Sequence, residues 1–342
     1  IISAKTSAVS FFQQYVKKDV KMIVVTGAAG FIGSVVLAAL NAEGYRDIYA
    51  VDHIDDELRK WNLNNKKYLR YFDKKEFIAM VRADKLEKTA DCVIHMGACS
   101  STTSMDAKYY EENNFQYTKT LAEWCLKKNA RFIYASSAAT YGDGSHGYKD
   151  DDETLRACKP LNLYGQSKQK FDLWALDNHV LNKMAGLKFF NVFGPNEYHK
   201  GDMRSVAAKA YERVVREGKM SLFKSYKKEC ADGEQKRDFI YVKDAVDIVM
   251  FFFQNPQING IFNVGTGKAR SWNDLAKALL KAANQPVNIE YIDMPEILKK
   301  QYQYFTEAEM GKLRHAGYDK PFMSLEDSVL DYVQYLKNRR YI

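Results

Sequence analysis

The chain has 342 residues, 46% of them hydrophobic and 27% charged, a balance typical of a globular protein and not of a disordered one. Its net charge of +8 is spread along the sequence, which favours a basic surface suited to anionic small molecules over binding to nucleic acid. The five cysteines and six histidines lack the spacing of metal ligands or of a disulfide framework. We therefore expect no metal site, and we expect the thiols to be reduced, as in the cytoplasm. Because the sequence has no long apolar stretch, we also expect no membrane span.

Short β-branched runs alternate with helical stretches from residue 22 onward, which indicates a parallel α/β sheet. Residues 1–21 precede this pattern and are interpreted either as a leader or as a native extension. The predicted strands are Met22–Val25, Ile48–Val51, Cys92–His95, Arg131–Ala135, Leu187–Asn191, Phe239–Val242 and Ile261–Val264, the last two as returns to the main sheet. The predicted helices are Ile32–Ala42, Tyr109–Lys128, one after Pro160, Trp272–Ala283 and Leu325–Leu336.

The fold class predicted from this order is a Rossmann-type, doubly wound parallel sheet with a smaller, partly interleaved α/β domain. We expect residues 22–192 and 239–265 to form the cofactor-binding domain. Residues 193–238 and 266–342 would form the substrate-binding domain, with a polar loop at residues 224–237.

A glycine-rich turn, Gly27-Ala-Ala-Gly30-Phe-Ile-Gly33, lies between the first strand and the first helix. Such glycines allow a tight turn and close approach of the backbone to a dinucleotide pyrophosphate at the helix N-terminus. Asp52 ends the second strand, where an acidic residue binds the ribose 2′-hydroxyl of NAD. Arg59 and Lys60 follow closely and could instead bind the 2′-phosphate of NADP, or form an ordinary solvated helix face.

Tyr164 and Lys168 are four residues apart on a predicted helix, so their side chains project from one face. A lysine ammonium beside the phenol, with a positive nicotinamide nearby, would lower the tyrosine pKa and make the phenol a usable acid or base. Ser137 follows a strand and could hydrogen-bond the reacting hydroxyl. Such a pair is often a surface feature, but here it accompanies a cofactor turn, which favours redox chemistry at a hydroxyl-bearing carbon.

Together these features resemble the extended short-chain dehydrogenase/reductase family, whose members modify nucleotide sugars. The resemblance covers residues 22–336. Within the family, it is strongest to the branch that epimerises ADP-heptose at C6. The motifs that carry it are HMGACSSTT (95–103), YASSAATYG (134–142), PLNLYGQSK (160–168), FNVFGP (190–195), HKG (199–201), KRDF (236–239), FNVGTG (262–267), YQYFT (302–306) and AGYDKPF (316–322).

The resemblance implies that tightly held NADP takes a hydride from C6 of the ADP-heptose, leaving a transient aldehyde that is reduced on its other face. Two acid/base groups are then needed, and the matching positions are Tyr164 and Lys200, with Lys168 and Ser137 assisting. Without the resemblance, Lys200 would be interpreted as an exposed loop lysine.

Other positions match the family residue by residue. The cofactor positions are Gly27, Gly30, Phe31, Ile32, Gly33, Asp52, His53, Arg59, Lys74, Met96, Gly97, Ala98, Cys99, Ser100, Asn113, Lys168 and Val192, with NAD as an alternative to NADP. The substrate positions are Ser137, Asn191, Asp202, Lys209, Phe223, Arg237 and Tyr302. Arg237 offers paired donors to a diphosphate, or else forms a salt bridge with Asp238.

Three departures from the family pattern stand out. Asp202 occupies a position where a serine is usual, the 226–235 segment is longer than usual, and Met96 replaces a polar residue.

Three other functions are considered beside the C6 epimerase. They are a sugar 4-epimerase, which would not need Lys200, a 4,6-dehydratase, and a non-catalytic NADP-binding protein. Ala138 and Ala139 argue against a dehydratase, which needs a carboxylate pair there.

The resemblance also implies an ADP-heptose substrate, a role in making the lipopolysaccharide inner core and a cytoplasmic homo-oligomer, commonly a pentamer in this family. It implies no nucleic-acid or membrane partner.

Overall fold

Seven parallel strands form the main sheet of the computed structural model, which describes residues 22–101, 104–299 and 302–342. Their spatial order is β10-β6-β5-β4-β1-β2-β3, the order of a doubly wound Rossmann-type sheet with one added strand. The strands are β1 (Ile23–Thr26), β2 (Ile48–Asp52), β3 (Arg70–Asp73), β4 (Cys92–His95), β5 (Arg131–Ser137), β6 (Met184–Phe189) and β10 (Gly260–Val264). The predicted fold class is confirmed, whereas the extension predicted at residues 1–21 lies outside the described residues.

Side chains that alternate along each strand build a core on both faces of this sheet. Ile23 and Val25 pack in a cluster with helices α1 (Phe31–Ala42) and α9 (Val242–Gln254). Val24 faces the opposite way, into a second cluster with helices α3 (Lys74–Arg82), α5 (Tyr117–Lys128) and α7 (Leu163–Asp177). Because both faces are covered, the central strands β1, β2 and β4 are buried along their whole length, and their carboxyl ends are left to line a site.

The second cluster is covered by helices that the sequence predicted only in part. They are α3 (Lys74–Arg82), α4 (Ala107–Tyr110), α5 (Tyr117–Lys128) and α7 (Leu163–Asp177), with α6 (Asp152–Ala157) beside α7. The helix predicted at Tyr109–Lys128 is interrupted by a π-helical turn at Glu111–Gln116. This turn aims consecutive side chains at different partners: Asn113 contacts Lys74, whereas Asn114 contacts Ser167.

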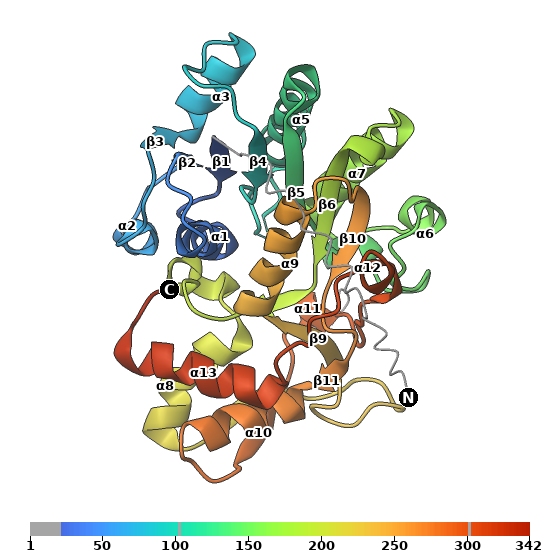
Figure 1. The fold of residues 1–342 in the computed structure, drawn as a ribbon. Coiled ribbons are helices and arrows are strands. Elements are labelled where there is room, and N and C mark those ends of the chain that lie inside the picture. Colours follow the sequence, from blue (N-terminus) through green and yellow to red (C-terminus); the bar gives the residue numbers. More distant parts are fainter. Residues whose placement is uncertain (1–21, 102–103, 300–301) are drawn as a thin grey trace, which may run out of the picture.

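Most of the remaining elements lie below the main sheet in Figure 1, whereas α12 lies beside β10. A three-stranded sheet contains β7 (Asn191–Phe193), β9 (Lys236–Tyr241) and β11 (Ala269–Ser271), and a two-stranded one contains β8 (Met220–Phe223) and β12 (Ile289–Ile292). The helices of this part are α8 (Val206–Glu217), α10 (Trp272–Ala282), α11 (Glu296–Lys299), α12 (Gly311–His315) and α13 (Leu325–Asn338). Short 3-10 turns occur at Ala138–Tyr141, Leu181–Lys183 and Tyr198–Met203.

Two strand predictions are wrong in detail. The strand predicted at Phe239–Val242 does not return to the main sheet, because β9 pairs with β7 and β11, and Val242 already begins α9. The strand predicted at Leu187–Asn191 is split at Phe190, where the chain leaves the main sheet for the small one. Both segments are apolar runs of the kind that any buried strand shows, so their pattern does not specify which sheet they join.

The sequence analysis also missed α2 (Glu57–Leu63), β3 and α3. β3 is the edge strand and is partly exposed, and α2 has only seven residues. Elements as short and polar as α2 and β3 lack the periodic apolar pattern on which prediction depends. Helix α3 has an apolar face at Phe77, Ile78 and Val81, so the sequence did contain a signal for it.

A buried ion pair joins α7 to the sheet. Lys188 of β6 donates to Asp172 of α7 at 2.8 Å, and the two side chains are 1% and 0% exposed. Ser136 and Tyr134 of β5 also donate to the Asp172 carboxylate. The helix that carries Tyr164 and Lys168 is therefore fixed by charge-assisted hydrogen bonds that water cannot reach.

We expect Lys188→Met to lower the free energy of unfolding by about 3–5 kcal/mol, because the Asp172 carboxylate would remain buried without its cation. The measurement is urea denaturation of both proteins. Arg156→Met is the matched control, since it breaks an exposed pair with Asp177 that contributes about 1 kcal/mol or less. Equal losses in the two variants would contradict this prediction.

Candidate active site

A cavity of about 510 Å³ opens at the carboxyl edge of the main sheet. Its lining comes from the segments that follow β1, β2, β4 and β5, together with α7 and the 3-10 turn at Tyr198–Met203. The residues predicted to hold the cofactor line this cavity, as do all four predicted catalytic residues, Ser137, Tyr164, Lys168 and Lys200. Lys60, the second cation considered for the 2′-phosphate, is the exception, since it is exposed and pairs with Glu57. Residues as far apart in sequence as Gly27 and Lys200 thus line the same cavity.

The glycine turn has the geometry that a pyrophosphate requires. A side chain on Gly27, whose φ is +67°, would lie 2.6 Å from the backbone nitrogen of Gly97, and one on Gly33 would lie 2.0 Å from the carbonyl oxygen of Gly27. Helix α1 begins after Gly30, which has no side chain to cap the first turn. The N–H groups of that turn are therefore available to an anion in the cavity, where the helix dipole is also favourable.

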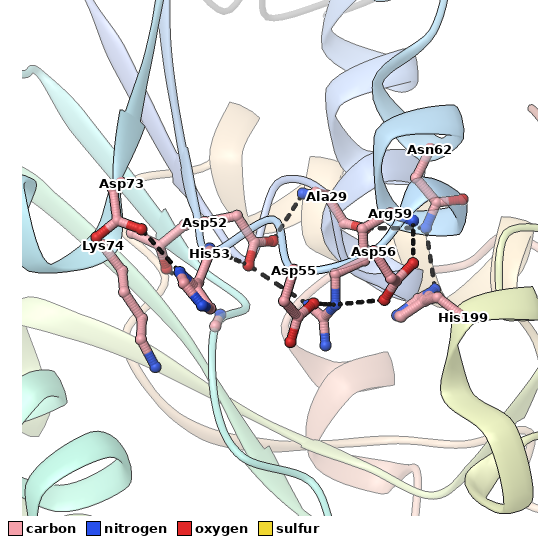
Figure 2. Close-up of polar contacts among 12 residues, drawn as sticks. Ala29, Asp52, His53, Asp55, Asp56, Arg59, Asn62, Asp73, Lys74 and His199 are labelled. Carbon is pink, nitrogen blue, oxygen red and sulfur yellow. Dashed lines mark hydrogen bonds and ion pairs between the residues drawn. The ribbon is translucent and has the colours of Figure 1, made fainter.

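Asp52 holds the turn against the end of β2. Its carboxylate accepts hydrogen bonds from the backbone N–H groups of Ala29, at 2.8 Å, and His53, at 2.7 Å. Burial raises the pKa of Asp52, although these N–H groups and Arg59 oppose the shift. Asp52 thus links the end of β2 to the glycine turn, as its contacts with Ala29 and His53 in Figure 2 show.

Cations surround this end of the cavity. The Arg59 guanidinium lies within ion-pair distance of three carboxylates, Asp52, Asp55 and Asp56. Lys74 donates to the amide oxygen of Asn113 at 2.9 Å and, among the residues that the structure describes, forms no ion pair. Lys74 is therefore the cation here whose charge is least neutralised by neighbours.

Tyr164 and Lys168 project from α7 into the cavity, as predicted. Burial raises the pKa of Tyr164, and the Ser137 hydroxyl opposes this shift. Lys168 donates to the carbonyl oxygen of Ala135 at 2.6 Å, and burial lowers its pKa to about 8. The predicted lowering of the tyrosine pKa is thus not produced by the protein's own groups, because desolvation of the phenolate exceeds the effects that favour it.

Lys200 reaches the same cavity from a different part of the chain. Its ammonium lies 5.2 Å from the centre of the Phe31 ring, at the start of α1. Burial lowers the pKa of Lys200, with Glu197 acting in the opposite direction. Gly201 follows with φ +51°, a left-handed conformation that favours glycine and turns the chain sharply after the lysine. The side chain of Lys200 is half-buried, whereas without the family resemblance it would be interpreted as an exposed loop lysine.

The predicted substrate residues other than Ser137 lie outside the lining of this cavity. Arg237 is buried, with its guanidinium 5.2 Å from the ring centre of Tyr302 and 5.7 Å from that of Trp272. It forms no salt bridge with Asp238, the alternative considered from the sequence, because that carboxylate accepts from Thr266 and the backbone around it. Arg237 is thus a buried cation held by aromatic rings.

The remaining substrate positions are more exposed. Asp202 and Lys209 are exposed and contact each other, since the Lys209 ammonium donates to the Asp202 carbonyl oxygen at 3.2 Å. Asn191 is exposed at the start of β7, and Phe223 is half-buried at the end of β8. The structure therefore brings Arg237 and Tyr302 together but does not gather all these residues.

Several lining residues received no role from the sequence analysis: Thr26, Val51, Asp55, Ser101, Tyr109, Tyr117, Ala135, Ser136, Phe189, Phe190, His199 and Met203. His199 precedes Lys200 directly, and Tyr109 and Tyr117 lie one helical turn on either side of Asn113. In the sequence, the one signal that could have identified these residues is that they lie close to a predicted site residue.

Comparisons with known proteins agree with this geometry. The model of the NAD dependent epimerase/dehydratase family matches residues 23–265. The chain is 54% identical over 321 residues to an ADP-L-glycero-D-manno-heptose-6-epimerase of Nitratidesulfovibrio vulgaris strain Hildenborough, covering 94% of this chain and 98% of that one. It is 48% identical over 322 residues to the protein of that name from Fusobacterium nucleatum, covering 92% and 97%.

Solved structures show the same relationship. The Helicobacter pylori ADP-L-glycero-D-manno-heptose-6-epimerase has a TM-score of 0.79 at 26% identity, covering 95% of this chain and 99% of that one. A UDP-glucuronic acid 4-epimerase from Bacillus cereus, solved with NAD, shares the fold with a TM-score of 0.73 at 24% identity, covering 93% and 99%. The chain therefore belongs to the NAD dependent epimerase/dehydratase family.

Proposed function

We propose that this chain is an ADP-L-glycero-D-manno-heptose 6-epimerase that holds NADP and inverts C6 of ADP-D-glycero-D-manno-heptose. The observation that carries the proposal is that Tyr164 and Lys200, from separate elements, line one cavity with the glycine turn. The names of the relatives at 54% and 48% identity support the choice of substrate. A 4-epimerase would have no use for the second acid/base group.

In this proposal the glycine turn, Asp52 and Lys168 would hold NADP, which when bound would supply the hydride acceptor and donor for C6. The phenol oxygen of Tyr164 holds the proton of the C6 hydroxyl on one side, with Ser137 hydrogen-bonded to that hydroxyl. The Lys200 amine exchanges the proton on the other side, and its lowered pKa makes the neutral amine easier to reach. Lys168 orients the cofactor ribose and, as a cation, favours the tyrosine phenolate.

We further propose that Arg237 and Tyr302 bind the diphosphate end of the substrate. Support comes from the burial of this guanidinium without a carboxylate partner among the described residues, an arrangement that an anionic ligand would complete. From the family resemblance we also propose that the product serves the lipopolysaccharide inner core and that the protein is a cytoplasmic homo-oligomer. None of the helices in the described part of the chain is long and apolar enough to cross a membrane.

The direct experiment is to incubate the protein and NADP with ADP-D-glycero-D-manno-heptose and follow the C6 configuration by NMR. Inversion at C6 is expected. Absence of inversion, with a protein that is folded and binds the nucleotide, would overturn the proposed function.

We expect Tyr164→Phe to reduce the rate of epimerisation by about 100- to 10,000-fold, the range for removal of a general acid or base. The affinity for NADP should stay within about threefold, because the change removes one hydroxyl group. Steady-state kinetics and nucleotide titration measure the two effects. Tyr211→Phe, on α8, is the control and should behave like the wild type.

Lys200→Met should also slow C6 inversion by about 100-fold or more, because one face of the carbon loses its acid/base group. Lys277→Met makes the same change on an exposed part of α10 and should leave the rate unchanged. Full activity in the Lys200 variant would favour a single-base mechanism of the 4-epimerase type.

The preference for NADP over NAD should depend on Lys74, because no described carboxylate lies within ion-pair distance of its ammonium. We expect Lys74→Met to weaken NADP binding by about 10- to 100-fold, the value of a charge-assisted hydrogen bond, and to leave NAD binding nearly unchanged. Isothermal titration with both nucleotides measures this difference. Lys75→Met, at the neighbouring exposed position, is the control, and an equal loss for NAD and NADP would contradict the assignment.

A further inference from the structure

Asn62 is a buried polar residue close to the cavity that the proposed mechanism does not use. It lies on α2 and is 0% exposed. Its side-chain oxygen has no hydrogen-bond partner among the described residues. A buried amide with one unsatisfied atom lowers the stability of the fold. We therefore ask what the contacts of its NH₂ group contribute in return.

The NH₂ group of Asn62 faces three acceptors from two different segments. It donates to the carbonyl oxygen of Ala29 at 2.9 Å and to that of Asn196 at 3.0 Å. It also lies 3.2 Å from Nδ1 of His199, as Figure 2 shows for the labelled side chain. Ala29 belongs to the glycine turn, whereas Asn196 and His199 belong to the segment that leads to Lys200. Asn62 therefore connects the turn to that segment.

The protonation of His199 agrees with this arrangement. Burial, together with Arg59 and Lys200, lowers the pKa of His199 to about 4. The imidazole is then neutral near pH 7, so one of its two ring nitrogens is an acceptor. Nδ1 accepts from the Asn62 NH₂ group in the tautomer whose proton is on Nε2.

A second contact fixes the same segment to the first helix. The side-chain amide of Asn196, which is buried and has φ +76°, donates to the Ser34 hydroxyl of α1 at 2.9 Å. The carboxylate of the next residue, Glu197, accepts from Tyr332 and from Ser205. The segment before Lys200 is thus held by buried hydrogen bonds on both sides.

We propose that Asn62 is a positioning residue, which, with the help of the Asn196–Ser34 contact, sets the place of Lys200 relative to the glycine turn. This inference rests on the proposed function, in which Lys200 exchanges a proton at C6. The glycine turn would hold the pyrophosphate of the cofactor, and the 196–200 segment carries the proton-exchanging amine. Asn62 bonds to both, so it fixes the distance between two groups that must act on one carbon.

The test uses Asn62→Asp, which keeps the shape of the side chain but replaces the NH₂ donor by an oxygen facing three acceptors. We expect kcat for epimerisation to fall by about 10- to 100-fold, the cost of a small misplacement of a catalytic group, while NADP affinity changes less than about threefold. Asn64→Asp makes the same change at an exposed position two residues away and should retain wild-type kinetics.

The double variant Asn62→Asp/Lys200→Met separates a positioning role from a general effect on folding. If Asn62 acts through Lys200, the double variant should be no slower than Lys200→Met alone. Multiplied losses, or a folded Asn62→Asp protein with full kcat, would overturn the inference.

Ser34→Ala keeps the inference testable if Asn62→Asp does not fold. It removes the hydroxyl that Asn196 contacts while leaving α1 a good helix former, and we expect kcat to fall by about two- to fivefold with no additional loss in the Lys200→Met background. Wild-type kcat in Ser34→Ala would then overturn the inference.

A crystal structure of Asn62→Asp gives a readout independent of activity. The Lys200 ammonium should no longer lie over the Phe31 ring, and an unmoved lysine would overturn the inference. If the wild type does not invert C6 but Lys200 moves in this variant, the proposed function fails while the structural role of Asn62 stands.

Discussion

Direct backbone contact between turns at the carboxyl edge of the main sheet is the constraint on which the site depends. Gly27 packs against the backbone of Gly97, and Gly33 packs against Gly27, with no space for a β-carbon at Gly27 or Gly33. This contact brings the ends of β1 and β4 close enough for the first turn of α1 to face the cavity. The N–H groups at the start of α1, Asp52 and residues 96–100 therefore line one cavity.

The charged side chains in and behind the cavity fall into two groups, one that stabilises the fold and one that is suited to ligands. The Asp172–Lys188 pair lies behind the cavity, is satisfied within the protein and fixes α7 to the sheet. Lys168 and Arg237 are buried and Lys200 is half-buried, and none of the three has a carboxylate in ion-pair distance among the described residues. Burial lowers the pKa of each one. Such groups are unfavourable in the protein alone and are suited to anionic ligands or proton exchange.

The local motifs were predictable because each one is short and its chemistry belongs to neighbouring residues. The glycine turn, Asp52 and the Tyr164–Lys168 pair are recognised from spacing within one strand or helix, and the structure places all of them on the cavity. Lys200 was predictable through family resemblance alone, since a lysine in a loop has no periodic signature. The strand at Phe239–Val242 was assigned to the wrong sheet because an apolar run indicates burial but not its partner strand.

The sequence by itself thus determined the Rossmann-type fold class, the glycine turn after the first strand and the Tyr164–Lys168 pair on one helix face, because these depend on local periodicity and residue type. Only the tertiary structure decided which distant segments meet. The contacts of Asn62 with Ala29 and Asn196 span 33 and 134 residues, and no local pattern specifies such a pairing. The tertiary structure also decided the protonation tendencies of Tyr164, His199 and Lys200, because burial is a property of the packed chain and is the largest cause of each shift.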